Sequence, residues 1–248
     1  MEIVVALVAG LFIGLVLGFV GAGGAMLALP IMIYLLGFTP FQATTAAMVV
    51  VGLAALAGAV VRWKKGEVLL REAITISTLG LATNITSANF AKDFSEPFIT
   101  TGLALVLAIA GWSMLLKPLN PGVEKRMSKP VLVLLALTIG AITGTFGIGG
   151  GFIAIPILVL FYNTPLAKAS GTSLVIIFLN SSIAFLSRFQ NWSEVSWHLP
   201  IIMAVIAILI STLAARIKIS SNLLKKSFAF LLFGVSLFTL LETFLISS

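Results

Sequence analysis

A glycine-rich segment of thirteen residues occurs twice in this chain. Residues 18–30 read GFVGAGGAMLALP, and residues 144–156 read GTFGIGGGFIAIP, 126 positions later. The same offset places Arg62 on Arg188 and Thr44 on Ser170. Such an ordered series of matches is typical of an internal structural repeat. The chain is therefore two copies of one unit, and the glycine cluster is the centre of each copy.

The composition predicts an integral membrane protein. Hydrophobic residues make up 60% of the 248 residues and charged residues only 9%, against roughly 25% charged residues in a soluble domain. No charged side chain occurs between Glu2 and Arg62. The net charge of +7 lies in loops between apolar runs, where basic residues set membrane topology, so it does not indicate nucleic-acid binding. The first residues include Glu2 and no basic residue, so we expect no cleaved signal peptide.

Long apolar runs divide the chain into two similar halves. Runs of about 20 residues indicate transmembrane helices rather than the shorter strands of a barrel. They cover 3–36, 41–61, 72–91 and 97–116 in the first half, and 131–163, 166–187, 197–215 and 226–246 in the second. We expect one transmembrane domain over 1–248, with repeat 1 at 1–116, a basic linker at 117–130 and repeat 2 at 131–248.

The first run of each half has an unusual length. A helix of residues 3–36 would measure about 50 Å, whereas the hydrocarbon core of a bilayer is about 30 Å thick. Two full crossings would need about 40 residues. We therefore expect a re-entrant hairpin of two half-length helices, with the glycines at its tip near the membrane midplane. Irregular backbone is tolerated at that depth only where it is buried in protein or lines a cavity.

The basic residues favour the re-entrant arrangement. If each long run returns to the side from which it enters, only Lys92 and Arg188 lie on one face and all other lysines and arginines lie on the opposite face. The positive-inside rule then predicts that loops 62–71, 117–129 and 216–226 are cytoplasmic in the plasma membrane. Each half would contain one hairpin and three transmembrane helices. The predicted fold is an all-α polytopic membrane protein of two inverted repeats, an architecture of alternating-access transporters.

The glycine clusters and the hydroxyl residues that follow them are the candidate site. A helix that begins just after the glycines has unpaired N–H groups and partial positive charge, which can hold an anion without lysine or arginine. Hydroxyl groups can donate hydrogen bonds to an oxyanion. The alternative is that the glycines and hydroxyls only serve helix packing and back-bonding to the preceding turn. The predicted substrate-binding residues are Gly21, Gly23, Gly24, Thr44, Thr45, Gly147, Gly149, Gly150, Gly151, Ser170, Thr172 and Ser173, with Pro30 and Pro156 shaping the half-helices.

Other kinds of chemistry have little support in the sequence. Neither glycine cluster has the spacing of a dinucleotide fingerprint or the Lys-Ser/Thr of a P-loop. No Asp, Glu or His lies in the middle of a predicted span, the chain has one histidine, and it has no cysteine. We therefore expect no catalytic centre, no metal site and no cofactor. Arg62 and Arg188 end matched spans, where we expect them to extend towards the interface, with attraction of anions as a second interpretation.

The paired Gly-x-Gly-Gly…Pro segments, each followed by a span rich in Ala, Thr and Ser (QATTAAM at 42–48 and KASGTSL at 168–174), resemble the sulfite exporter TauE/SafE family. The likeness covers essentially the whole chain. The resemblance implies a membrane permease for small sulfur-containing anions such as sulfite or an organosulfonate. The first copy departs from the pattern, because Ala25 stands where the second has Gly151.

The sequence thus predicts a transporter, which the resemblance implies is an exporter, that holds a small anion between two hairpin tips and works by alternating access. Its partners would be the anionic substrate and the lipid bilayer, with no nucleic acid, and a homo-oligomer is compatible with the sequence. Two other functions stay open at this stage. They are a passive anion channel and a non-transporting membrane scaffold that binds a partner through its basic loops.

Overall fold

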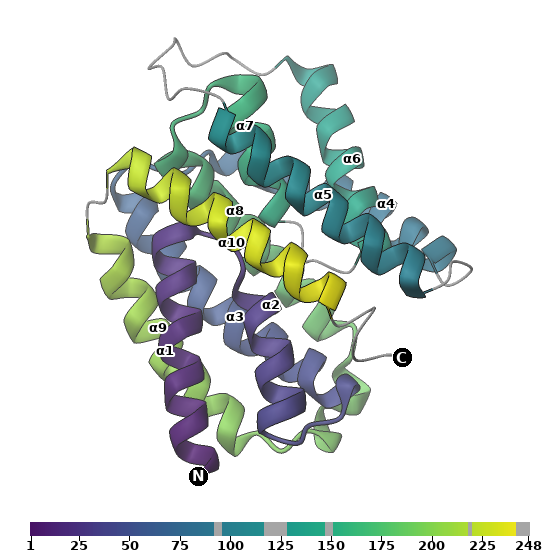
Figure 1. The fold of residues 1–248 in the computed structure, drawn as a ribbon, viewed down its shortest axis with the longest axis vertical. Coiled ribbons are helices and arrows are strands. Elements are labelled where there is room, and N and C mark those ends of the chain that lie inside the picture. The colour runs from purple at the N-terminus through teal and green to yellow at the C-terminus, as the bar shows by residue number, and fades with distance from the viewer. Residues whose placement is uncertain (92–95, 117–127, 147–150, 218–219, 242–248) are drawn as a thin grey trace. The chain divides into compact units, whose positions relative to one another are not determined.

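The computed structural model describes residues 1–91, 96–116, 128–146, 151–217 and 220–241, and within these ranges every regular element is helical (Figure 1). The first half contains α1 (Glu2–Val20), α2 (Gly24–Pro30), the wide-turn helix η1 (Ile31–Leu35), α3 (Pro40–Lys64), α4 (Leu70–Ala91) and α5 (Glu96–Leu116). The second half contains α6 (Lys129–Phe146), α7 (Gly151–Tyr162), α8 (Leu166–Leu186), the short helix η2 (Phe189–Glu194), α9 (His198–Arg216) and α10 (Ser221–Leu241). The prediction of an all-helical chain is confirmed for these residues.

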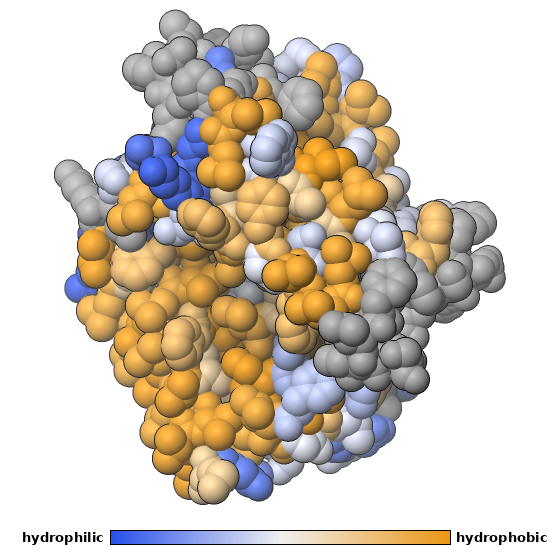
Figure 2. Space-filling view, viewed as in Figure 1, coloured by the Kyte–Doolittle hydropathy of each residue, from blue (hydrophilic) through white to orange (hydrophobic). Residues whose placement is uncertain are grey.

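Several of these helices are suited to a bilayer. Five of the described helices are long and apolar enough to cross a membrane: Glu2–Val20, Pro40–Lys64, Leu166–Leu186, His198–Arg216 and Asn222–Leu241. Large apolar side chains stay exposed along α1 and α9, and Figure 2 shows a continuous apolar surface over this part of the molecule. Such a surface is too large for a soluble monomer and fits lipid contact. The chain is a multi-pass membrane protein.

The duplication is visible in the local geometry as well as in the sequence. The second arm of each predicted hairpin ends in the same turn, in which the backbone N–H of Phe38 donates to the Met32 carbonyl at 2.9 Å and that of Thr164 to the Leu158 carbonyl at 3.1 Å. The residue before each donor has a positive φ, 70° at Gly37 and 53° at Asn163. This is a common way of ending a helix, because the left-handed residue turns the chain back over the last carbonyls. Equivalent residues of the two copies therefore adopt equivalent backbone.

The first predicted hairpin is broken where the sequence indicates, but its arms are unequal. Gly21 and Gly23 have φ values of 82° and 95°, which glycine adopts without the steric cost of a Cβ. The first arm, α1, has 19 residues and measures about 28 Å, so the expectation of a half-length first arm is wrong. The second arm continues past Pro30 into η1, because proline removes a backbone donor and widens the next turn.

The second copy follows the same plan in the part that the structure describes. Its arms are α6, of 18 residues, and α7, of 12 residues. Pro156 lies inside α7, as Pro30 lies at the end of α2. The predicted glycines Gly147, Gly149 and Gly150 lie outside the described residues, and only Gly151 of that cluster begins a described helix.

The helices pack into two compact units, and each unit takes segments from both halves of the chain. Unit 1 comprises Met1–Ile74 and Ser170–Lys218, and unit 2 comprises Thr75–Ala169 and Ile219–Ser248. In unit 1, α1 and α9 lie side by side and run in the same direction (Figure 1). A methyl group built on any of three glycines of α1 would lie 2.7 Å from an α9 carbonyl oxygen. The pairs are Gly10 with Met203, Gly14 with Ala207 and Gly18 with Ser211.

Small residues also bring α3 against its neighbours in unit 1. The Ser211 hydroxyl of α9 donates to the Ala54 carbonyl of α3 at 2.9 Å. On α8, Leu174 lies next to Gly58 and Ser181 next to Gly52, so α8 runs antiparallel to α3. Close approach of backbones at Gly, Ala and Ser is the usual source of helix association in lipid.

Unit 2 repeats both kinds of helix pair. The helices α4 and α6 run parallel, with Gly80 against Gly140 and with the Ser87 hydroxyl donating to the Ala141 carbonyl at 2.9 Å. The helices α5 and α10 run antiparallel, because the Ser236 hydroxyl donates to Ala104 O at 2.8 Å while Lys225 Nζ donates to Leu115 O at 3.2 Å.

Candidate functional site

The first glycine break meets the ends of several helices of unit 1. The C-terminal ends of α1, α3 and α9 lie together with the start of α8, and the break at Gly21 lies among them. We call this region, comprising residues 18–24, 62–67, 170–172 and 215–216, the Gly21 end. Three parallel helices and one antiparallel helix bring these residues together from positions about 200 residues apart in the chain.

Gly21 is in direct contact with Ser170. A methyl group at Gly21 would lie 2.6 Å from the carbonyl oxygen of Ser170 and 2.7 Å from its Cβ, which is closer than such atoms approach. Only glycine fits this position, because it also has a positive φ. Two residues predicted for the site, one from each copy, are thus brought side by side.

The Ser170 hydroxyl has no hydrogen-bond partner in the structure. Ser170 is fully buried, and its Oγ neither donates nor accepts a protein hydrogen bond. Leaving a buried polar group unsatisfied costs about 1–3 kcal/mol, so native proteins rarely do so without a water or ligand to complete the group. The Gly21 end therefore contains one buried hydroxyl without a protein hydrogen-bond partner.

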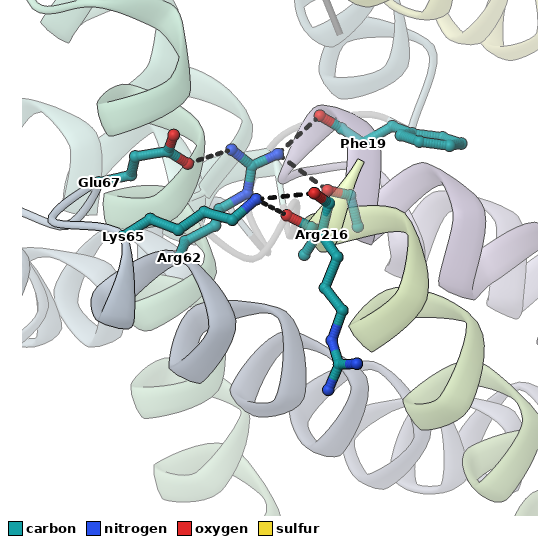
Figure 3. A network of polar contacts seen from close by, with 7 residues as sticks. Phe19, Arg62, Lys65, Glu67 and Arg216 are labelled. Atoms are coloured by element: carbon teal, nitrogen blue, oxygen red, sulfur yellow. Dashed lines mark hydrogen bonds and ion pairs between the residues drawn. The ribbon is translucent and has the colours of Figure 1, made fainter. Parts of the chain in front are cut away.

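Arg62 holds the end of α1 at this site (Figure 3). Its buried guanidinium donates through Nη2 to the carbonyls of Gly18, at 2.8 Å, and Phe19, at 3.0 Å, and through Nη1 to Glu67 Oε2 at 3.3 Å. Carbonyls at a helix C-terminus lack intrahelical donors and carry partial negative charge, so a cation stabilises them. The expectation that Arg62 extends to the interface is wrong, because it bonds inward instead.

Lys65 caps a second helix in the same network. Its Nζ donates to the carbonyls of Ala215, at 2.8 Å, and Arg216, at 3.0 Å, which end α9. In Figure 3 the side chain of Arg216 points away from this network. The two cations at the end of α3 thus fix the ends of the parallel pair α1 and α9, and with them the backbone at the glycine break.

The remaining hydroxyls of α8 differ from Ser170. Thr172 Oγ1 accepts a hydrogen bond from the Leu69 backbone N–H at 3.0 Å and so ties the loop after α3 to α8. Ser173 is fully buried in the next position. The backbone of Gly171 packs against the Glu67 carbonyl. A Cβ built on Gly171 would lie 3.2 Å from the Cβ of Arg62.

Thr44 and Thr45 lie far from this cluster. They are near the start of α3, about 26 Å along the helix from Arg62. Their hydroxyls donate to carbonyls four residues earlier, Thr44 to Pro40 O at 2.6 Å and Thr45 to Phe41 O at 2.9 Å. The predicted residues of unit 1 therefore form two groups at opposite ends of α3, while Gly151 begins α7 in unit 2.

This separation also corrects the expected depth of the first hairpin tip. Gly21 contacts Ser170, and the next residue of α8 packs against Arg62, which is two residues before the end of α3. The glycine break is thus level with the end of α3 rather than with its middle. Since α3 is itself a candidate span, the expected midplane position is wrong for this copy.

The start of α3 forms the opposite end of unit 1. Thr39 and Gln42 make a reciprocal capping box with Pro40 as the first helical residue, which defines where α3 begins. Gln42 Nε2 also donates to the Glu194 carbonyl at 2.8 Å. Arg188 Nη1 donates to Thr45 Oγ1 at 3.4 Å. We call this region, comprising residues 39–45 and 185–198, the Thr45 end.

Comparison with known proteins identifies the family. A family model described as sulfite exporter TauE/SafE matches residues 6–239. The chain belongs to this family. A probable membrane transporter protein of Xylella fastidiosa (strain 9a5c) is 28% identical over 250 residues, which cover 96% of this chain and 95% of that protein. A probable membrane transporter protein of Bacillus subtilis (strain 168) is 23% identical over 223 residues, covering 79% of this chain and 81% of that protein. No solved structure matches the chain.

Membership makes this TauE/SafE protein a membrane transporter. Within the described residues, no group of three or more His, Cys, Asp or Glu side chains is placed to hold a metal ion. The sequence had suggested glycines and hydroxyls as the chemistry of the site, and of these Gly21 and Ser170 are brought together. The sequence analysis did not predict that Arg62 and Lys65 cap the C-terminal ends of α1 and α9. The match of Arg62 with Arg188 in the repeat was the one indication that Arg62 has a structural role.

Proposed function

We propose that this TauE/SafE protein is a carrier that exports a small oxyanion, such as sulfite or an organosulfonate, by alternating access. The observation that carries the proposal is the buried, unpartnered Ser170 hydroxyl in contact with Gly21 at the helix break. The backbone N–H groups that open α2 after Gly23 have no intrahelical acceptor. Backbone N–H groups and a hydroxyl can donate hydrogen bonds, which suits an anion.

Two inverted repeats are part of the proposal. The matched helices α3 and α8 pack antiparallel in unit 1, and the matched helices α5 and α10 do so in unit 2. Equivalent helices that lie against each other in opposite directions are what a two-fold axis in the membrane plane produces. The helices α1 and α3 both end at the Gly21 end, so both begin at the Thr45 end. The first long apolar run therefore leaves the Thr45 end along α1 and returns to it before α3 begins, which supports a re-entrant hairpin.

The distribution of charge suggests which end faces the cytoplasm. Arg62, Lys64, Lys65 and Arg216 belong to the Gly21 end, whereas Arg188 belongs to the Thr45 end. By the positive-inside rule we assign the Gly21 end to the cytoplasmic side of the plasma membrane. An exporter would then take up its substrate beside Ser170. The other predicted site residues, including Thr44, Thr172, Ser173 and the second glycine cluster, stay predictions.

Uptake of radiolabelled sulfite into proteoliposomes tests the function. Saturable uptake with counterflow supports a carrier, whereas non-saturating flux would indicate a channel and no flux a scaffold. Ser170→Ala should raise the KM for sulfite by about tenfold, because a hydrogen bond to a charged group is worth roughly 1.5–3 kcal/mol. Its thermal stability should not fall, since Ser170 Oγ has no protein partner to lose.

Ser113→Ala is the matched control for this experiment. Ser113 lies on α5 in unit 2, outside the Gly21 end, and its hydroxyl donates to the Ala110 carbonyl of the same helix at 2.9 Å. Its KM should equal that of the wild type. If Ser170→Ala transports sulfite with an unchanged KM, the role of the Gly21 end in binding is refuted.

A further inference from the structure

Arg188 differs from Arg62, its counterpart in the first copy, in what surrounds its charge. Arg62 pairs with Glu67, but the residue five positions after Arg188 is Ser193. Among the described residues, Arg62 forms an ion pair with Glu67, whereas no carboxylate oxygen lies within 4.0 Å of Arg188. The second arginine of the repeat is therefore a half-buried cation without an acidic partner in the part of the chain described.

The groups that do contact Arg188 leave most of its donors unused. Its Cζ lies 5.1 Å from the centroid of the Phe41 ring, and Nη1 donates to Thr45 Oγ1 at a long 3.4 Å. A guanidinium has five N–H donors in a planar fork. Both contacts come from the first two turns of α3, whose dipole adds further positive potential at this end. Burial lowers the pKa of Arg188 from its ordinary value, yet arginine stays charged in proteins.

Aromatic residues hold the backbone around Arg188 in place. The rings of Phe185 and Trp192 stack with centroids 4.2 Å apart, and Trp192 Nε1 donates to the Phe185 carbonyl at 3.1 Å. Trp197 Nε1 donates in turn to the Trp192 carbonyl at 2.9 Å. A fixed backbone lowers the entropy cost of binding a ligand at the side chain that it carries.

We propose that Arg188 binds a small oxyanion at the Thr45 end, as a recognition point separate from Ser170. This inference rests on the proposed transport function and adds a second anion contact at the opposite end of α3. The free N–H groups of the guanidinium would bind two oxygens of the anion side by side, which lysine cannot reproduce. The ring of Phe41 holds the guanidinium plane, while Thr45 fixes one of its edges. Glu67 neutralises Arg62, so the first copy has no equivalent contact.

The phosphate of a lipid headgroup is also an oxyanion, and the test separates it from the dissolved solute that we propose. The full-length protein is reconstituted in nanodiscs of phosphatidylcholine, and sodium sulfite and sodium methanesulfonate are titrated by calorimetry. Arg188→Gln should weaken binding of both salts about tenfold, the equivalent of losing roughly 1.4 kcal/mol. Arg188→Lys should weaken it about threefold, because charge is kept and the paired hydrogen bonds are lost.

Lys226→Gln is the control, because it removes one positive charge from an exposed side chain on α10, outside both the Gly21 end and the Thr45 end. It should bind both salts as the wild type does. Unchanged binding in Arg188→Gln would overturn the inference, and if that variant does not fold, unchanged binding in Arg188→Lys would do so.

A lipid contact would give a different pattern. Adding phosphatidylglycerol to the nanodiscs would then raise the melting temperature of the wild type but not of Arg188→Gln, with equal salt binding in both, and this result would also overturn the inference. If sulfite flux is present in the wild type and Arg188→Gln leaves salt binding unchanged, only this inference fails. If the wild type neither transports nor binds either salt, the proposed function fails with it.

Discussion

Gly21→Ala tests the contact between the glycine break and Ser170. A methyl group there would lie 2.6, 2.7 and 2.8 Å from the carbonyl oxygen, Cβ and Cα of Ser170, none of which can rotate away. The left-handed backbone at φ 82° costs a non-glycine residue about 1–2 kcal/mol. Overpacking against fixed atoms adds about 1–3 kcal/mol. We therefore expect Gly21→Ala to lower the free energy of unfolding by about 2–5 kcal/mol.

Gly37→Ala separates these two contributions. Gly37 has a similar φ of 70°, but a methyl group built on it meets nothing within 4 Å. It should therefore lose only the backbone component, about 1–2 kcal/mol. Unfolding of both variants in mixed micelles can be followed by tryptophan fluorescence, since the chain has four tryptophans.

Transport provides the second measurement for this pair. Gly21→Ala should reduce sulfite flux strongly, because displacing Ser170 moves the hydroxyl that we assign to the substrate. Gly37→Ala should retain it. Equal losses of stability in the two variants would refute the close approach of Gly21 to Ser170 and the reasoning built on it.

Three further predictions follow from unit 1. Arg62→Met should lower the free energy of unfolding by about 3–5 kcal/mol, because it removes the donor to the carbonyls that end α1. Glu67→Gln should lower it by about 1 kcal/mol or less, since the Glu67 side chain is partly exposed. Equal losses in thermal unfolding would contradict the capping of α1 by Arg62. Gly14→Ala should destabilise by about 1–3 kcal/mol by forcing α1 away from α9, measured in the same way. Because the chain has no cysteine, Glu2→Cys and Lys64→Cys each carry a single thiol for labelling with a membrane-impermeant maleimide on intact cells. Only Glu2→Cys should react, since we assign the Gly21 end, which includes Lys64, to the cytoplasmic side. Labelling of Lys64→Cys alone would reverse the assigned orientation.

The helix series was predictable because its signals are local. Hydropathy predicted the helices, and α4, α5, α8 and α9 begin and end within two residues of the predicted runs. The glycines at positions 21 and 23 predicted a break, because few other residues adopt a positive φ. The arm lengths were wrong because the length of an apolar run does not say where the break divides it.

The site was predicted only in part because its contacts are distant in sequence. Nothing near Arg62 indicates that it bonds to carbonyls 44 and 43 residues earlier, and a charge at the end of a span usually indicates the interface. Ser170 and Thr44 are equivalent in the sequence, yet Thr44 donates to its own helix and Ser170 has no partner. Such differences arise from the packing of other helices against each copy.

The packing of α1 against α9 has a consequence for how the protein is made. Gly18 is synthesised 193 residues before Ser211, its contact on α9. At about 5–20 residues per second, a ribosome needs roughly 10–40 s to produce the partner. During that interval the small-residue face of α1 lies in the bilayer without α9 packed against it. A first helix inserted in this way is suited to transient binding by the insertion machinery or by an assembly chaperone.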